Sequence, residues 1–128
     1  MTNVRPTEGE LAILQVLWDR GEPCTVREVH QALSRSKDTA YTTVLKMMTI
    51  MAEKGLVRRD ESERSHRYAA THPQDKVQSA LLKDLMQRAF SGSALQLVQR
   101  ALDVDGTSRE ELDDIAQLIA RARKQRDR

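Results

Sequence analysis

Two neighbouring stretches of this sequence carry side chains that can bind phosphate groups and base edges. In residues 41–54, a helical projection at about 100° per residue collects threonines and a lysine on one side. Threonine is a weak helix former, so a threonine-rich face is unusual unless it binds something. Its hydroxyl can hydrogen-bond a phosphate or a base edge, its methyl can contact a thymine methyl, and a lysine reaches farther. The pattern therefore predicts a helix that contacts DNA. The face comprises Thr42, Thr43, Lys46, Thr49, Ile50 and Glu53.

The opposite side of this helix is apolar, and we expect it to be buried. Lys54 and Gly55 predict its carboxyl end, because glycine readily adopts the left-handed conformation of a C-cap. Thr39 is the expected N-cap, and Thr39 and Tyr41 are further candidate DNA contacts at the amino end. The apolar side comprises Tyr41, Val44, Leu45, Met47, Met48, Met51 and Ala52.

The second stretch, residues 56–69, is expected to form a β-hairpin rich in arginine. Two short runs, 56–59 and 64–69, flank a polar turn. Alternation places Arg64 and Arg67 on opposite sides of their strand, so at least one of them faces outward. Arg58, Arg64 and Arg67 are therefore candidate phosphate contacts. The same stretch contains three acidic residues, so the alternative of a solvent-exposed hairpin that does not bind DNA stays open.

Two further helices precede these stretches, and each opens with a capping box. Residues 7–10 (TEGE) begin a helix that runs to about Arg20, and residues 25–28 (TVRE) begin a second one. The order helix, helix, helix, hairpin within about 70 residues is that of a winged helix-turn-helix, in which the third helix enters the major groove and the hairpin is the wing. The sequence thus predicts a mainly α fold with a small β-hairpin, and a DNA-binding domain over residues 1–72.

Residues 73–128 are expected to form a helical dimerisation domain. Three short amphipathic helices can hardly build a core of their own, so we expect them to bury their apolar faces against a second copy. The alternative is that they fold back onto the first domain and leave a monomer. The candidate dimer contacts are Val77, Leu81, Leu85, Leu95, Val98, Leu102, Leu112, Ile115 and Ile119.

Composition limits the remaining possibilities. The chain has 128 residues, and no apolar stretch approaches the roughly 20 residues of a membrane span. Its first residues, 1–6, lack the apolar core of a secretory signal, so we expect a cytoplasmic protein without membrane insertion. The net charge of +2 says little about nucleic acid, because binding depends on the charge at the contact surface.

Catalytic and metal sites are not expected. The three histidines, His30, His66 and His72, have no metal-ligand spacing, so no metal or cofactor is predicted. The single Cys24 excludes an intramolecular disulfide and is better explained as a small, partly buried residue than as a reactive thiol. The sequence is therefore not that of an enzyme.

Four segments together resemble the BlaI/MecI penicillinase repressors. They are EGELAIL with the following LW, TVREV, AYTTV and EKGLV, at residues 8–18, 25–29, 40–44 and 53–57. The resemblance implies a homodimeric winged-helix repressor that binds inverted-repeat operators with TACA and TGTA elements, with β-lactam resistance genes among the possible targets. It also implies groove and backbone contacts by Thr42, Thr43 and Lys46.

The chain departs from this family at three points. Ile50 stands where many relatives carry a basic residue, and Arg100-Ala101 stands where the family has the Asn-Phe bond that is cut when a membrane-bound sensor protease responds to β-lactam. The paired Cys-x-Cys motif of copper-responsive relatives is missing, so copper sensing is not expected. Two other functions stay open: a winged helix that binds a partner protein and no DNA, and a regulator with a small-molecule pocket between its halves.

Overall fold

The structure is a computed structural model that describes residues 5–104 and 106–127. It divides into two compact units, residues 1–83 and 84–128, and each is described by itself. The assignment of residues 1–72 to DNA binding and 73–128 to dimerisation stays a prediction. Residues 1–4, which belong to the stretch from which no secretory signal is predicted, lie outside the described part.

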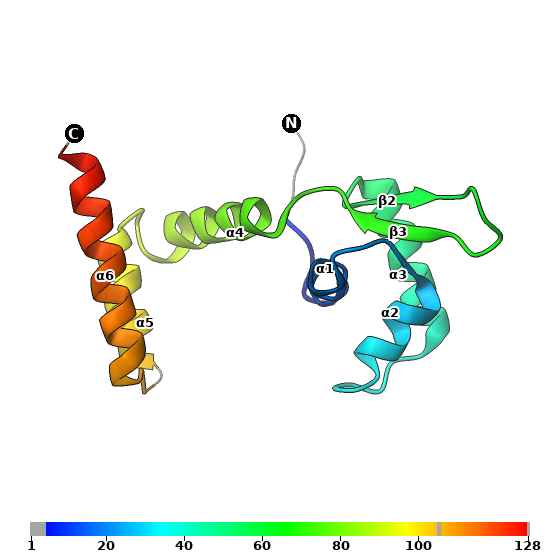
Figure 1. Cartoon of the computed structure of the whole chain (residues 1–128), viewed down its shortest axis with the longest axis horizontal. Coiled ribbons are helices and arrows are strands. Elements are labelled where there is room, and N and C mark those ends of the chain that lie inside the picture. The colour runs from blue at the N-terminus through cyan, green and yellow to red at the C-terminus, as the bar shows by residue number, and fades with distance from the viewer. Residues whose placement is uncertain (1–4, 105, 128) are drawn as a thin grey trace. The chain divides into compact units, whose positions relative to one another are not determined.

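The first unit is a winged helix, as the sequence predicts (Figure 1). Three helices pack on an antiparallel sheet in the order β1-β3-β2, so that the last strand of the chain lies in the middle. Its elements are α1 (Glu8–Arg20), β1 (Cys24–Thr25), α2 (Val26–Leu33), α3 (Tyr41–Lys54), β2 (Val57–Asp60) and β3 (Arg67–Ala70). Its core cluster of buried apolar residues comprises Ile13, Leu14, Leu17, Cys24, Val26, Val29, Val44, Met48, Met51, Leu56, Val57 and Tyr68.

Both predicted capping boxes are confirmed. In α1, the Glu10 amide donates to the Thr7 hydroxyl at 3.2 Å, and the Thr7 amide donates to the Glu10 carboxylate at 2.9 Å. In α2, the same reciprocal bonds join Thr25 and Glu28 at 3.2 and 2.8 Å. These bonds satisfy amides at the helix starts that have no partner within the helix. Gly55 ends α3 with a φ of 81°, the left-handed conformation expected there.

Two local predictions are wrong. Thr39 does not cap α3: the N-cap is Ala40, whose side chain can make no hydrogen bond, and the Thr39 carbonyl lies against His30 instead. The second wing strand does not begin at Arg64, because residues 61–66 form the loop that connects β2 to β3. We call residues 61–66 the wing loop. The two-residue strand β1 was not predicted at all, since so short a segment has no periodicity.

The remaining helices are α4 (Gln74–Ala89), α5 (Ala94–Val104) and α6 (Arg109–Arg126), and α4 crosses the boundary between the two units. Ser93 and Ser108 accept backbone bonds at the starts of α5 and α6, at 3.1 Å each. Large apolar side chains on these helices are exposed, with Leu95 reaching 77%. Within the described residues, no helix is both long and apolar enough to cross a bilayer.

Candidate nucleic-acid interface

The amino end of α3 is the least protected helix start of the winged helix. The Ala40 cap offers no side-chain acceptor, and the first turn contains no acidic residue. By contrast, α1 and α2 each carry a glutamate there that bonds to the backbone. Free amides and the positive end of a helix dipole attract anions. The start of α3 is thus open to an anionic group such as a phosphate.

The face of α3 turned away from the core is largely the predicted one. Thr42, Thr43, Lys46 and Ile50 are exposed, and Val44, Met48 and Met51 on the other side are buried. Thr49 is different from the other threonines, because it is half-buried and its hydroxyl donates to the Leu45 carbonyl at 2.9 Å. Its donor is therefore used inside the helix.

Two residues assigned to the buried side of α3 are exposed, which corrects the helical projection. Tyr41 and Leu45 expose 43% and 40% of their surface. A projection gives the direction of a side chain but not how far another element covers it, and the contact between the Tyr41 ring and His30 still leaves much of this edge of α3 exposed. The exposed face of α3 is thus broader and more apolar than predicted.

His30 holds the connection between α2 and α3 in place. Its Nε2 lies 2.7 Å from the Thr39 carbonyl, and its ring packs edge-on against that of Tyr41 at 5.8 Å between centroids. A hydrogen bond at this point fixes the backbone immediately before the amino end of α3. This role could not be predicted from the sequence, because a lone histidine on a helix has no distinguishing spacing.

An ion pair between the buried Glu10 and the exposed Lys54 holds the carboxyl end of α3. Lys54 Nζ lies 2.9 Å from both carboxylate oxygens of Glu10, which is 4% exposed and also caps α1. Burial opposes ionisation of Glu10, but the bonds from Lys54 and from the Thr7 amide outweigh it and hold the pKa of Glu10 below its ordinary value. Both ends of α3 are therefore fixed to other helices.

The basic side chains around this face are of two kinds. Arg67 and Arg20 both pair with Glu28, at 3.5 and 2.9 Å, and Arg59 pairs with Glu61 at 3.0 Å. Arg67, a predicted DNA contact, thus also ties β3 to α2. Within residues 5–104 and 106–127, the other basic groups of this region form no ion pair. They are Arg27, Lys46, Arg58 and Arg64.

Five of the predicted contacts line three separate hollows of the first unit. Tyr41 and Arg64 line one groove between α3 and the wing loop. Thr39 and Thr43 line a hollow between α1 and the amino half of α3. Arg58 lines a shallow depression with Ala52 and Gly55 at the carboxyl end of α3. The structure therefore brings Tyr41 and Arg64 to one groove and Thr39 and Thr43 to another, and Arg58 lines neither of them.

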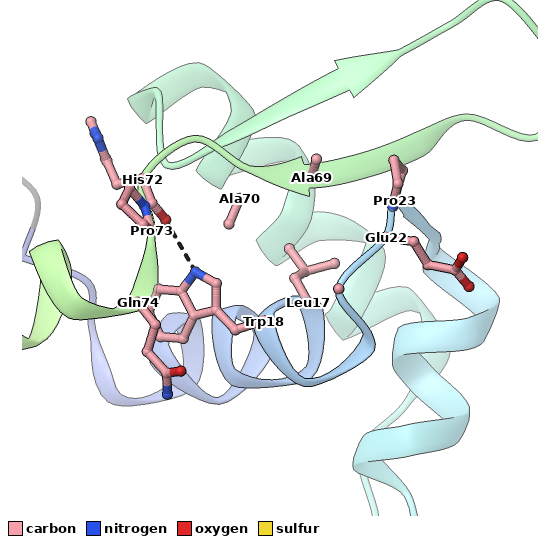
Figure 2. A pocket seen from close by; sticks show the side chains of 10 residues that line it. Leu17, Trp18, Glu22, Pro23, Ala69, Ala70, His72, Pro73 and Gln74 are labelled. Carbon is pink, nitrogen blue, oxygen red and sulfur yellow. Dashed lines mark hydrogen bonds between the residues drawn. The ribbon is translucent and has the colours of Figure 1, made fainter.

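The remaining hollow of interest lies on the other side of α1 and is mainly apolar. Figure 2 shows Trp18 in its wall, with the indole Nε1 donating to the His72 carbonyl at 3.1 Å. This bond anchors the chain just before α4.

Cys24 is fully buried, its thiol lies 3.3 Å from the Glu22 carbonyl, and burial raises the pKa of that thiol. A structural role for Cys24 agrees with this environment.

A family model described as penicillinase repressor matches residues 6–121. The chain belongs to this family. The resemblance read from the sequence is confirmed, and so is the prediction that the chain is not an enzyme, since penicillinase repressors are regulators of transcription.

Individual members of the penicillinase repressor family agree with this assignment. The transcriptional regulator BlaI of Mycobacterium tuberculosis, from strains CDC 1551 / Oshkosh and ATCC 25618 / H37Rv, is 41% identical over 87 residues. The match covers 68% of this chain and 63% of each relative, so less than two thirds of their length is spanned. The solution structure of monomeric Bacillus licheniformis BlaI in complex with the blaP half-operator is similar in fold, with a TM-score of 0.50 and 20% identity, over 59% of this chain and 92% of that one.

Proposed function

We propose that this chain is a DNA-binding repressor of transcription that acts as a homodimer on an inverted-repeat operator. The observation that carries the proposal is the exposed face of α3. It combines an uncapped amino end with exposed threonines and the unpaired Lys46, next to a wing that carries Arg58 and Arg64. In a winged helix, this helix lies in the major groove and the cations beside it contact phosphates.

The relatives support the same function. The M. tuberculosis proteins are named transcriptional regulators, and the B. licheniformis structure contains a half-operator. A half-operator implies a second half, which suits an inverted repeat bound by a two-fold dimer. TACA and TGTA elements are the first operator sequences to test, and β-lactam resistance genes are candidate targets. A repressor must reach promoter DNA, which supports the expected cytoplasmic location.

The second unit offers a surface for dimerisation. The candidate contacts on α5 and α6 are exposed, from 37% at Leu102 to 77% at Leu95, except for Ile115, which is half-buried. A segment of 45 residues is too small to leave such side chains in water without cost, because each buried leucine contributes about 1.5–3 kcal/mol. Val77 differs from the other candidates, since it is 1% exposed within the single chain and has little surface to offer. The candidates that keep exposed or half-buried surface are Leu81, Leu85, Leu95, Val98, Leu102, Leu112, Ile115 and Ile119.

Release from DNA would follow from loss of the dimer. Arg100-Ala101, at the position of the bond cut in penicillinase repressors, lies on the exposed surface of α5. A cut in α5 would remove a helix of the proposed dimer surface, whichever protease makes it. A membrane-bound sensor protease is one candidate for this step.

The test is fluorescence anisotropy of the full chain on a labelled duplex with TACA and TGTA inverted repeats, against a scrambled duplex, over a salt series. We expect preference for the repeat and an affinity that falls steeply with salt, because counterions are released from each neutralised phosphate. Lys46→Gln should weaken binding, and Lys76→Gln, an equal charge change on α4, should have little effect. Weak binding to both duplexes with a shallow salt dependence would contradict the proposal and favour a protein partner for α3.

A further inference from the structure

A groove with cationic walls runs beside the exposed face of α3. Three segments distant in sequence form it: the start of α2 contributes Arg27, the first two turns of α3 contribute Tyr41 and Leu45, and the wing loop contributes Arg64 and His66. Neither Arg27 nor His66 was expected to contact DNA from the sequence. Because the walls belong to separate elements of one folded unit, the spacing of their charges is set by the fold and not by a single flexible strand.

The charges in this groove are not used by the protein itself. Among the described residues, neither Arg27 nor Arg64 takes part in an ion pair. The acid nearest to Arg27 in sequence, Glu28, is already engaged by the Thr25 amide and two other arginines. Asp60 accepts the Ser62 amide at 2.9 Å, and this hydrogen bond, with smaller contributions from the charges of Arg67 and His66, holds the pKa of Asp60 below its ordinary value.

We propose that this groove binds one phosphodiester group of a DNA strand that borders the major groove in which α3 lies. The inference rests on the proposed function, and adds to it a specific contact and two residues, Arg27 and His66. A helix in a major groove about 12 Å wide has a phosphate backbone along each flank. The groove occupies the flank of Tyr41 and Leu45, which is where one of the two backbones passes.

The chemistry of the two walls fits a phosphodiester better than an acidic peptide. Guanidinium groups form paired hydrogen bonds with phosphate oxygens, and Arg27 and Arg64 can approach the same group from opposite elements. Leu45 and the Tyr41 ring form an apolar wall against which a deoxyribose can pack. The wing loop is thereby fixed relative to α3, so the contact sets the register of the helix on DNA without reading bases.

The experiment compares Arg27→Gln, Arg64→Gln and the double variant of the full chain on both duplexes over the salt series. Arg59→Gln is the matched control, because it removes an equal charge from the same wing but from an arginine already paired with Glu61. All three arginines are exposed, so the variants should keep the fold, which circular dichroism checks.

Each single groove variant should weaken binding about fivefold at physiological salt, equally on both duplexes, but lower the salt slope by clearly less than about 1, because the remaining arginine still neutralises the phosphate. The double variant should lower the slope by about 1 and not by about 2, because both side chains hold the same phosphate. Arg59→Gln should change the slope by less than half as much as the double variant. An unchanged slope in the double variant, a loss of about 2 in it, or an equal loss in Arg59→Gln would overturn the inference. Such a result, obtained with a wild-type chain that binds duplex DNA, would leave the proposed function intact, whereas failure of the wild-type chain to bind would remove both.

Discussion

The ion pair between Glu10 and Lys54 gives a prediction with a definite asymmetry. The Glu10 side chain is 6% exposed, and that of Lys54 is 44% exposed. Glu10→Gln keeps an acceptor for the Thr7 amide and leaves an ammonium group that water can reach, so we expect a loss of about 1 kcal/mol in the free energy of unfolding. Lys54→Met leaves a buried carboxylate with the Thr7 amide as its remaining partner, and should cost about 2–3 kcal/mol.

Urea unfolding measures both losses, and the protein concentration is held fixed because the proposed dimer would make stability depend on concentration. The double variant Glu10→Gln/Lys54→Met should be more stable than Lys54→Met alone, because it no longer buries a charge. If Lys54→Met costs no more than Glu10→Gln, or if the double variant is the least stable of the three, the reasoning from burial is wrong.

The same pair predicts a change in pH dependence. In the wild-type chain the pKa of Glu10 lies below its ordinary value of 4.5. Its contribution to stability is therefore complete at neutral pH and is lost as the pH falls through the folded-state pKa. In Lys54→Met, burial without the ammonium should raise the pKa of Glu10, so that protonation relieves the unpaired charge. The stability difference between this variant and the wild type should then narrow as the pH is lowered from about 7 to about 5, and a constant difference would contradict the account.

Three further predictions concern DNA binding, dimerisation and packing. Thr42→Ala should reduce the preference for the operator over a scrambled duplex several-fold in anisotropy, whereas Thr49→Ala, whose hydroxyl already bonds within α3, should change it little; equal effects would mean that the face does not read bases. Leu95→Glu should weaken the dimer at least tenfold in sedimentation equilibrium without loss of helix content, and an unchanged dimer would place the interface elsewhere. Trp18→Phe should lower the free energy of unfolding by about 1 kcal/mol in urea, because the His72 carbonyl loses its donor.

The features that sequence predicts well are those fixed by neighbouring residues. The capping boxes at Thr7 and Thr25 need only two side chains three positions apart, and Gly55 needs only its own backbone freedom. The errors at Tyr41 and Leu45 have a different origin, because their exposure depends on which other element covers that edge of α3. The local sequence pattern therefore predicts the order of the helices and strands and the centre of the exposed face of α3, but not how far that face extends around the helix.

The same distinction explains why the groove beside α3 was only half predicted. Arg64 stands in a stretch visibly rich in arginine, whereas Arg27 is an isolated basic residue inside a capping box, and only the fold brings the two to one groove.

Glu28 shows why the charge of the chain describes its surface so poorly. This one carboxylate caps α2 and also neutralises Arg20 and Arg67, so two of the arginines near the wing serve the fold. The hydrogen bond from the Thr25 amide, together with these arginines, holds the pKa of Glu28 below its ordinary value, and the carboxylate stays charged at neutral pH. In the net charge of the chain, the negative charge of Glu28 offsets the charge of any one arginine. In the fold it offsets the charges of Arg20 and Arg67, and among the residues that the structure describes the charges of Arg27 and Arg64 have no acidic partner. A nearly neutral chain can thus present a cationic surface to DNA, because its acidic residues are placed where the fold needs them.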